Sequence, residues 1–146
     1  MSRQWNLRVA TTEQEILKVM VVRGIVFIEE QQVDWEGEID EFENESVHFL
    51  GEVDGQPVAT GRLRFLSDGR AKVERIAVRP AWRGKGYARD VVRYLLAYAA
   101  DQGAHRYVMH AQVYLQKFYE DFGFRREGDI FRECGIDHIT MVREDR

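Results

Sequence analysis

The sequence predicts a mixed α/β (α+β) fold, in which a mostly antiparallel sheet contains one central parallel pair of strands and carries helices on both faces. A strand–helix–strand unit over residues 71–111 supports the parallel pair, because such a unit forms a right-handed crossover. Short turns such as Asp54-Gly55 make the remaining strands antiparallel. With 146 residues and no obvious linker, the chain should form a single domain, residues 1–146.

The first part of the chain predicts a strand, a helix and an acidic connection. Residues 5–10 alternate apolar and polar side chains, which is typical of a half-buried strand. Thr12 and Glu15 fit a capping box, and apolar residues at helical spacing extend the helix to the low twenties, where Gly24 should interrupt it. Seven carboxylates in the twelve residues 34–45 predict a solvated surface loop or short helix.

The rest of the chain alternates strand and helix signals. Asp54-Gly55 favours a hairpin, and a turn at residues 67–70 leads into the next strand. A long amphipathic helix should end at Gly103, and a short one at Gly123. The strands are expected at 48–53, 58–65, 71–78 and 106–111, the helices at 86–102 and 114–122, and two short strands within 128–142.

Composition excludes several classes of protein. The net charge of −4 argues against non-specific nucleic-acid binding, which usually needs a basic face. One cysteine, Cys134, allows neither a disulfide framework nor a cysteine-based zinc site, so we expect no bound metal and a reducing compartment. The first five residues lack the apolar segment of a signal peptide, and no apolar run approaches a membrane span. We therefore expect a cytoplasmic protein.

The segment 73–88 carries the strongest chemical signal. An apolar strand is followed by Pro80, a loop with Gly84 and Gly86, and the start of the long helix. The glycines leave the backbone open, the first turn of the helix presents free N–H groups, and Arg83 and Lys85 add positive charge. This combination predicts a phosphate or pyrophosphate site; the alternative is a basic, flexible surface turn. It matches neither a P-loop nor a dinucleotide fingerprint.

The same residues resemble the Gcn5-related N-acetyltransferase (GNAT) superfamily. Arg83-Gly84-Lys85-Gly86-Tyr87-Ala88 is similar to its Arg/Gln-x-x-Gly-x-Gly/Ala signature, and Ile76-Ala77-Val78-Arg79-Pro80 is similar to its fourth strand and turn. Residues 118–124 resemble its Tyr-x-x-x-Gly-Phe segment. A narrower resemblance, to the ElaA/YjcF-like bacterial branch, lies in Arg23, Val26, Phe27, Glu30, Gln31, 40–42, His48, 59–64 and 110–112.

The resemblance implies an acetyl-CoA-dependent N-acyltransferase of the GNAT fold, in which the central parallel strands splay apart around the cofactor. The acceptor would be a primary amine of a small molecule or a peptide, attacking the thioester directly. The pantetheine arm would lie along the fourth strand, and the diphosphate on the signature loop. The implied cofactor-binding residues are Ile76, Ala77, Val78, Arg83, Gly84, Lys85, Gly86, Tyr87, Ala88, Arg89 and Gln112, with Gln116 as the alternative to Gln112.

The same resemblance suggests catalytic roles. Tyr119 matches the general acid for the departing thiolate, and a phenol is protonated at neutral pH. The main-chain N–H of Val78 is the implied oxyanion donor. Glu74 is the candidate base, since strand alternation would put it on the same side as Ile76 and Val78; the alternative is a structural ion pair with Arg62 or Arg64. Glu30 competes for this role.

The acceptor site is less well marked. Arg23, Phe27, Glu30 and Gln31 would border it, although packing of the first helix explains them equally. His110 would stand at the cleft wall; the alternative is a hydrogen-bonded structural histidine. The carboxylates of residues 34–45 could attract a cationic amine over a distance. Two other functions remain open, a non-catalytic GNAT-fold module that binds acyl-CoA and a general anion-binding regulatory domain. We expect no nucleic-acid or membrane partner, and a homodimer stays open.

Overall fold

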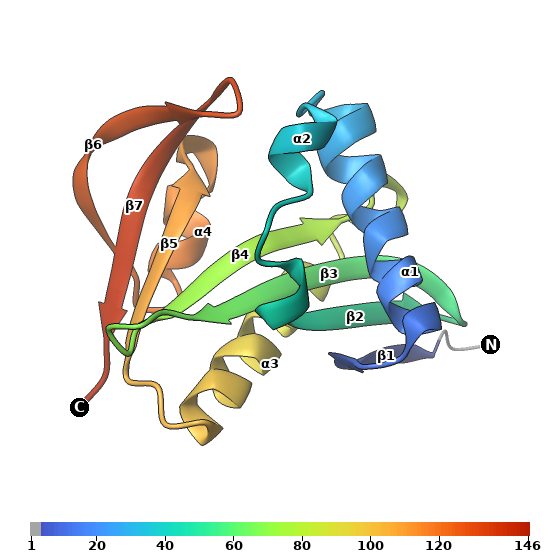
Figure 1. Ribbon diagram of the computed structural model, residues 1–146, viewed down its shortest axis with the longest axis horizontal. Helices are drawn as coiled ribbons and strands as arrows, with labels where there is room; N and C mark the ends of the chain where they lie inside the picture. Colours follow the sequence, from blue (N-terminus) through green and yellow to red (C-terminus); the bar gives the residue numbers. More distant parts are fainter. Residues whose placement is uncertain (1–3) are drawn as a thin grey trace.

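The computed structural model describes residues 4–146; residues 1–3, the start of the segment searched for a signal peptide, lie outside it. One seven-stranded sheet has the order β1-β2-β3-β4-β5-β7-β6, and only the β4–β5 pair is parallel, which confirms the predicted fold class (Figure 1). The strands are β1 (Trp5–Ala10), β2 (Val47–Val53), β3 (Gln56–Phe65), β4 (Ala71–Val78), β5 (Arg106–Gln112), β6 (Arg125–Glu133) and β7 (Ile136–Glu144).

Helices cover both faces of this sheet. The neighbouring residues Phe49 and Leu50 on β2 point to opposite faces, where Phe49 packs against Leu95 of α3 and Leu50 against Val19 of α1. The helices are α1 (Glu13–Arg23), the π-helix η1 (Gly24–Glu30), α2 (Trp35–Glu38), η2 (Glu43–Glu45), η3 (Pro80–Trp82), α3 (Tyr87–Asp101), η4 (Val113–Leu115) and α4 (Gln116–Glu120). Within residues 4–146, no helix combines the length and apolar character needed to cross a membrane.

The α-helix ends at Arg23 with Gly24 at its C-cap, as predicted, but Gly24 does not end the helical path, because the chain continues as the π-helix η1. Gly24 has helical angles, φ −61° and ψ −44°, and η1 follows α1 without a break. A glycine inside a helix costs only about 1 kcal/mol relative to alanine. Packing of Val22 and Val26 on Ala77 of β4 outweighs that cost and keeps the chain helical to Glu30.

The two parallel strands pair over a short distance and then diverge. Residues Ala71 to Val73 of β4 pair with Tyr107 to Met109 of β5, and the pairing ends there. Beyond this point β4 continues beside β3, while β5 continues beside β7 as far as Gln112. Figure 1 shows β5, β6 and β7 standing at a steep angle to β1–β4. The divergence leaves one edge of β4 without a strand partner.

A bulge in β4 changes which side chains share a face. Arg75 has a positive φ of 55°, and the register between β3 and β4 shifts between Thr60 and Arg62. Ile76 and Val78 therefore pack on the α3 side, in the cluster that contains Val91. Glu74 instead bonds to Arg62, whose other partners lie in the segment between α2 and η2. The predicted placement of Glu74 on the same side as Ile76 and Val78 is wrong, because the bulge inserts one residue.

The C-terminal strands are longer than expected. β6 and β7 contain nine residues each, and they meet at a turn in which Cys134 and Gly135 both have positive φ. β7 lies between β5 and β6, so that Gln112 of β5 is opposite His138 and His110 is opposite Thr140. The hairpin of β6 and β7 thus extends the sheet beside the diverging strands.

Candidate active site

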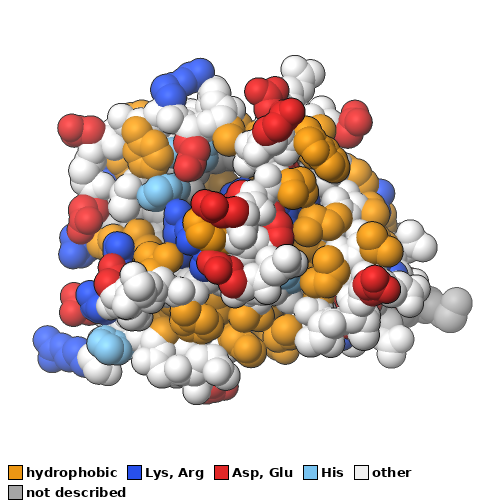
Figure 2. Space-filling view, in the orientation of Figure 1, with side chains coloured by type: hydrophobic (Ala, Val, Ile, Leu, Met, Phe, Trp, Pro, Cys, Tyr) orange, Lys and Arg blue, Asp and Glu red, His pale blue; other side chains and the backbone are white. Residues whose placement is uncertain are grey.

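A cavity of about 640 Å³ opens where β4 and β5 diverge. Its walls come from the end of η1, the α2 segment, the middle strands, α4 and the turn between β6 and β7. Figure 2 shows the hollow on this face, bordered by histidine, acidic and basic side chains. Its lining includes the side chains of Phe27, Gln31, Phe42, Arg62, Arg64, Lys72, Glu74, Arg83, His110, Gln112, Tyr119, Glu133 and His138.

The main chain of β4 faces this cavity at Val78. The N–H of Arg79 donates to the carbonyl of Val58 on β3 at 2.9 Å. In an antiparallel pair the hydrogen-bonding direction alternates from one residue to the next, so the N–H and C=O of Val78 point away from β3. The guanidinium of Arg83 reaches the carbonyl of Val78 from that open side, at 2.9 Å. An extended amide ligand could pair with the open edge as an added strand would.

The glycine-rich loop leads directly into α3. Gly84 and Gly86 have φ of 77° and 86°, and a Cβ added to either would meet nothing within 4 Å. Gly86 occupies the N-cap position, so the free N–H groups of the first turn of α3 border open space. Tyr87 lies apart from the cavity, stacked on Trp5 with ring centroids 4.3 Å apart. The loop geometry therefore suits an anion such as a diphosphate.

The three cations expected near the loop differ in their partners. Arg83 is paired with Glu30 at 2.5 Å, and Arg89 with Asp121 at 3.0 Å. Lys85 is exposed and has no ion-pair partner within 4 Å among residues 4–146. Arg83 and Ala88 line the cavity, whereas Gly84, Lys85, Gly86 and Arg89 lie outside its lining. Lys85 is thus the loop cation free to meet an anion directly.

Tyr119 is buried in the floor of the cavity, on α4. Its ring makes edge contacts with Phe118 and Phe124, at centroid distances of 5.0 and 6.3 Å. Burial in this apolar setting raises the pKa of Tyr119 well above its ordinary value, because the phenolate would lose its hydration. The side chain is therefore a neutral hydroxyl throughout the physiological range, and it lines the cavity.

The acidic segment 34–45 is not simply a solvated surface. Glu38 is 2% exposed and binds Arg23, which is 1% exposed, at 2.5 Å. Glu43 also binds Arg23, and Asp40 binds Arg62 through both oxygens at 2.8 Å. The prediction of a solvated segment is wrong for these three carboxylates, because arginines on α1, β3 and β4 draw them inward.

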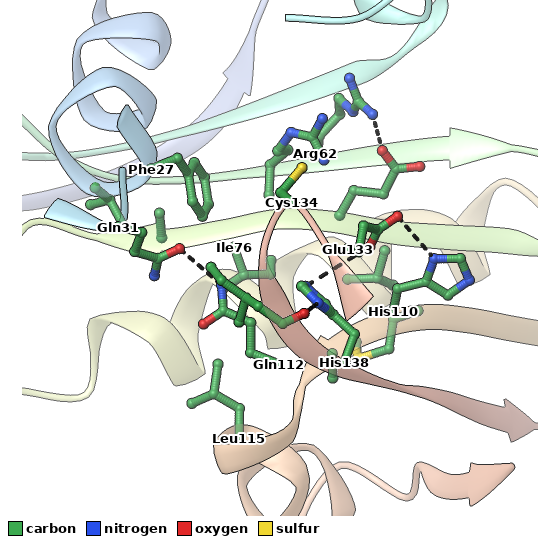
Figure 3. A pocket seen from close by; sticks show the side chains of 18 of the residues that line it. Phe27, Gln31, Arg62, Ile76, His110, Gln112, Leu115, Glu133, Cys134 and His138 are labelled. Carbon is green, nitrogen blue, oxygen red and sulfur yellow. Dashed lines mark hydrogen bonds and ion pairs between the residues drawn. The ribbon is translucent and has the colours of Figure 1, made fainter. Parts of the chain in front are cut away.

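Of the acceptor residues expected from the sequence, three line the cavity and two do not. Phe27, Gln31 and His110 face it, and Gln112 at the end of β5 donates to Gln31, which follows η1, at 2.9 Å (Figure 3). Arg23 lies outside the lining, within the buried ion-pair network. Glu30 also lies outside it, bound to Arg83; Gln116, the alternative to Gln112, is likewise not among the lining residues.

The β6–β7 hairpin brings to the cavity two residues, Glu133 and His138, that the sequence did not predict as part of the site. Glu133 faces His110 at 3.6 Å and His138 at 3.9 Å (Figure 3). His138 Nδ1 lies 2.7 Å from the carbonyl of Ile136, a contact that fixes the ring. The proximity of His110 lowers the pKa of Glu133. Strand alternation could have predicted which side chains of β6 and β7 share a face, but it could not have predicted that β7 lies next to β5.

Comparison with known proteins identifies the family. The model of the acetyltransferase (GNAT) family matches residues 15–124. A Bacillus subtilis protein named uncharacterized N-acetyltransferase YjcF is 36% identical over 137 residues, covering 93% of this chain and 97% of that protein. A crystal structure of Escherichia coli ElaA has a TM-score of 0.84 at 24% identity, covering 98% of this chain and 100% of that chain. A crystal structure of an acyl-CoA N-acyltransferase from Pseudomonas aeruginosa has a TM-score of 0.85 at 26% identity, covering 97% and 99%. The chain belongs to the acetyltransferase (GNAT) family, close to its ElaA- and YjcF-like members, and is an acyltransferase.

Proposed function

We propose that this enzyme transfers the acetyl group of acetyl-CoA to a primary amine of a small molecule or peptide, by direct attack of the amine on the thioester. The observation that carries the proposal is the open main-chain edge of β4 at Val78, which lies beside the cavity and eight residues before Gly86 at the N-terminus of α3. An acyl-CoA donor is also supported by the name of the similar Pseudomonas aeruginosa protein.

The donor would be held by the strand edge and the loop together. The main chain of Ile76 and Val78 would pair with the amide arm, and the side chains of Ala77 and Gln112 would border it. The amides of residues 83–88 would bind the diphosphate, with Lys85 as its nearest free cation and Arg83 and Arg89 at its sides. The bound donor supplies an activated acyl thioester.

The N–H of Val78 would polarise the thioester carbonyl. It points away from β3 toward the cavity, and a fixed main-chain donor stabilises the negative charge that develops on that oxygen. Tyr119 would donate its hydroxyl proton to the departing thiolate. Its raised pKa keeps it protonated, and its burial in the cavity floor holds it away from bulk water.

Two groups compete for the proton that the attacking amine must lose, the Glu74 carboxylate and the His110 imidazole beside Glu133. Glu74 has both oxygens engaged, one by Arg62 and one by Arg64 at 3.1 Å, so we assign to it the positioning of these arginines. Glu133 faces His110, and a carboxylate that orients an imidazole forms a familiar general base. His110 would therefore accept the amine proton while the C–N bond forms and the C–S bond breaks.

The test follows release of free thiol from acetyl-CoA in the presence of polyamines, amino acids, amino sugars and peptides. We expect thiol release that requires an amine, together with an equal amount of N-acetylated product. Thiol release at the same rate without amine would contradict transfer to an amine. Binding of acetyl-CoA without thiol release on any acceptor would favour the non-catalytic module instead.

A further inference from the structure

Two cations stand side by side in the wall of the cavity, on neighbouring strands. Arg64 of β3 and Lys72 of β4 are direct cross-strand partners, and both line the cavity. Their side chains are 15% and 20% exposed. The next pair on the same face, two residues along each strand, is Arg62 with Glu74. Side chains of such pairs lie within reach of one another and of one ligand.

The neighbouring carboxylates are already matched by other arginines. Glu38 binds Arg23 and Arg75, and Glu43 binds Arg23 and Arg62. Asp40 binds Arg62 and Arg75. Three carboxylates thus balance three guanidinium groups in the layer formed by α1, the 34–45 segment and the bulge of β4.

Arg64 and Lys72 share the carboxylate of Glu74 with Arg62. Arg64 donates to it through Nε at 3.1 Å, and the ammonium of Lys72 lies 3.8 Å away, beyond hydrogen-bond distance. In the part of the chain that the structure describes, neither terminal nitrogen of Arg64 has a hydrogen-bond partner. Its guanidinium lies over the ring of Phe42, at 3.7 Å from the centroid, which fixes its plane.

These contacts define a site with donors in excess of acceptors. The Nε of Arg62, buried beside this pair, also lacks a hydrogen-bond partner among residues 4–146. The terminal nitrogens of Arg64 are reachable from the cavity, so their free N–H groups are open to a ligand there. A carboxylate suits them best, because its two oxygens match the fork of a guanidinium and a neighbouring ammonium adds charge. Glu133, which also lines the cavity, offers the opposite charge.

We propose that the acceptor is an amine that also carries a carboxylate, an amino acid or a related aminocarboxylic acid, with its carboxylate on Arg64 and Lys72. Its amine then extends toward His110 of β5, two residues beyond the Val108 that pairs with Lys72. The proposal rests on the proposed acetyl transfer and narrows its substrate class. It disfavours polyamines and amino sugars, which would bring positive charge or neutral hydroxyls to the two cations.

The test compares each common amino acid with the amine that remains when its α-carboxylate is removed. With wild-type enzyme we expect kcat/KM at least about tenfold higher for the amino acid in the preferred pair, in line with charge-assisted hydrogen bonding. Arg64→Gln and Lys72→Gln should remove that preference, so that the amino acid and its decarboxylated amine react with the same kcat/KM. Arg64→Lys keeps the positive charge but loses the forked guanidinium, so its preference for the amino acid should lie between those of the wild type and Arg64→Gln.

Arg70→Gln is the matched control, because Arg70 lies on the same β3–β4 hairpin, binds Asp68 at 2.8 Å and does not line the cavity. It should leave the preference unchanged. Equal kcat/KM within every pair, with thiol still released, would overturn the carboxylate site and leave the proposed function intact. If no thiol is released from acetyl-CoA with any acceptor, calorimetric titration with the N-acetyl amino acids tests the carboxylate site. Binding that weakens at least about fivefold in Arg64→Gln supports the site, and no binding overturns it.

Discussion

Gln112, the last residue of β5, donates a hydrogen bond from Nε2 to Oε1 of Gln31 at 2.9 Å, although 81 residues separate them in the chain. Gln31 follows directly after η1, so the bond ties the first helical segment to the strand that diverges from β4 (Figure 3). Both side chains line the cavity. The bond therefore bridges the two walls between which a donor and an acceptor would meet.

Removing the hydrogen bond between Gln31 and Gln112 should lower the stability of the fold, and the effects of the two substitutions should not be additive. We expect Gln31→Ala and Gln112→Ala each to lower the free energy of unfolding by about 1 kcal/mol, because each leaves its partner amide unpaired. In a domain of this size that corresponds to a fall of about 2–4 °C in Tm. The double variant should lose less than the sum of the two. Strictly additive losses in thermal unfolding would show that the two amides do not interact in solution.

Gly86→Asp should weaken donor binding more than Gly86→Ala. A Cβ at residue 86 meets nothing within 4 Å, so neither substitution clashes, and both share the strain of a positive φ, about 1–2 kcal/mol for an ordinary residue. Only aspartate adds negative charge at the N-terminus of α3. We expect at least a tenfold larger Kd for acetyl-CoA in Gly86→Asp, and a smaller change in Gly86→Ala. Equal Kd values in calorimetry would argue against an anion at this position.

The ion pairs of Glu43 predict a loss of stability in acid. Burial opposes ionisation of Glu43, but the hydrogen bond and charge of Arg23 outweigh it and lower its pKa to about 2, from 4.5 in a free side chain. Between these values the unfolded chain takes up a proton that the folded chain does not, so the free energy of unfolding falls as the pH decreases. Glu43→Gln should flatten that dependence in urea unfolding.

Glu45→Gln, which alters an exposed residue of the same short helix η2, serves as the control. Its acid dependence should match that of the wild type. An unchanged slope in Glu43→Gln would mean that the pairing of Glu43 with Arg23 does not stabilise the folded state.

His110 and Glu133 should together set the rate of the chemical step. We expect His110→Gln to lower kcat by about 10²–10⁴-fold, the usual contribution of a general base, and Glu133→Gln to lower it less, since the ring remains. Glu74→Gln should lower kcat less than His110→Gln does, because Glu74 positions Arg62 and Arg64; the opposite order of the two losses would reverse the two assignments.

Much of the fold was predictable because the local sequence patterns favour the same helices, strands and turns that the structure contains. The crossover unit from β4 through α3 to β5 follows from one apolar strand, one amphipathic helix and one further strand. The capping box of Thr12 and Glu15 is present as predicted. The loop at Gly84 and Gly86 was recognisable because both glycines adopt the positive φ that other residues avoid.

The composition of the cavity wall was less predictable, because it depends on contacts between distant segments. The bulge at Arg75 leaves no mark in the alternation of β4, yet it decides which face Glu74 occupies. The ion pair of Glu38 with Arg23 joins two residues whose spacing in the sequence gives no indication that they are in contact. The strand order β5-β7-β6, which brings Glu133 to His110, is a choice of tertiary pairing rather than of local propensity.

The most direct test of the mechanism is the rate of amine-dependent thiol release by Tyr119→Phe. The substitution removes only a hydroxyl from a buried ring, so the fold and the Kd for acetyl-CoA should stay close to those of the wild type. If Tyr119 protonates the departing thiolate, turnover falls by more than about tenfold, within the range expected for general acid catalysis. Wild-type turnover in this variant, with wild-type donor binding, would show that Tyr119 does not protonate the departing thiolate.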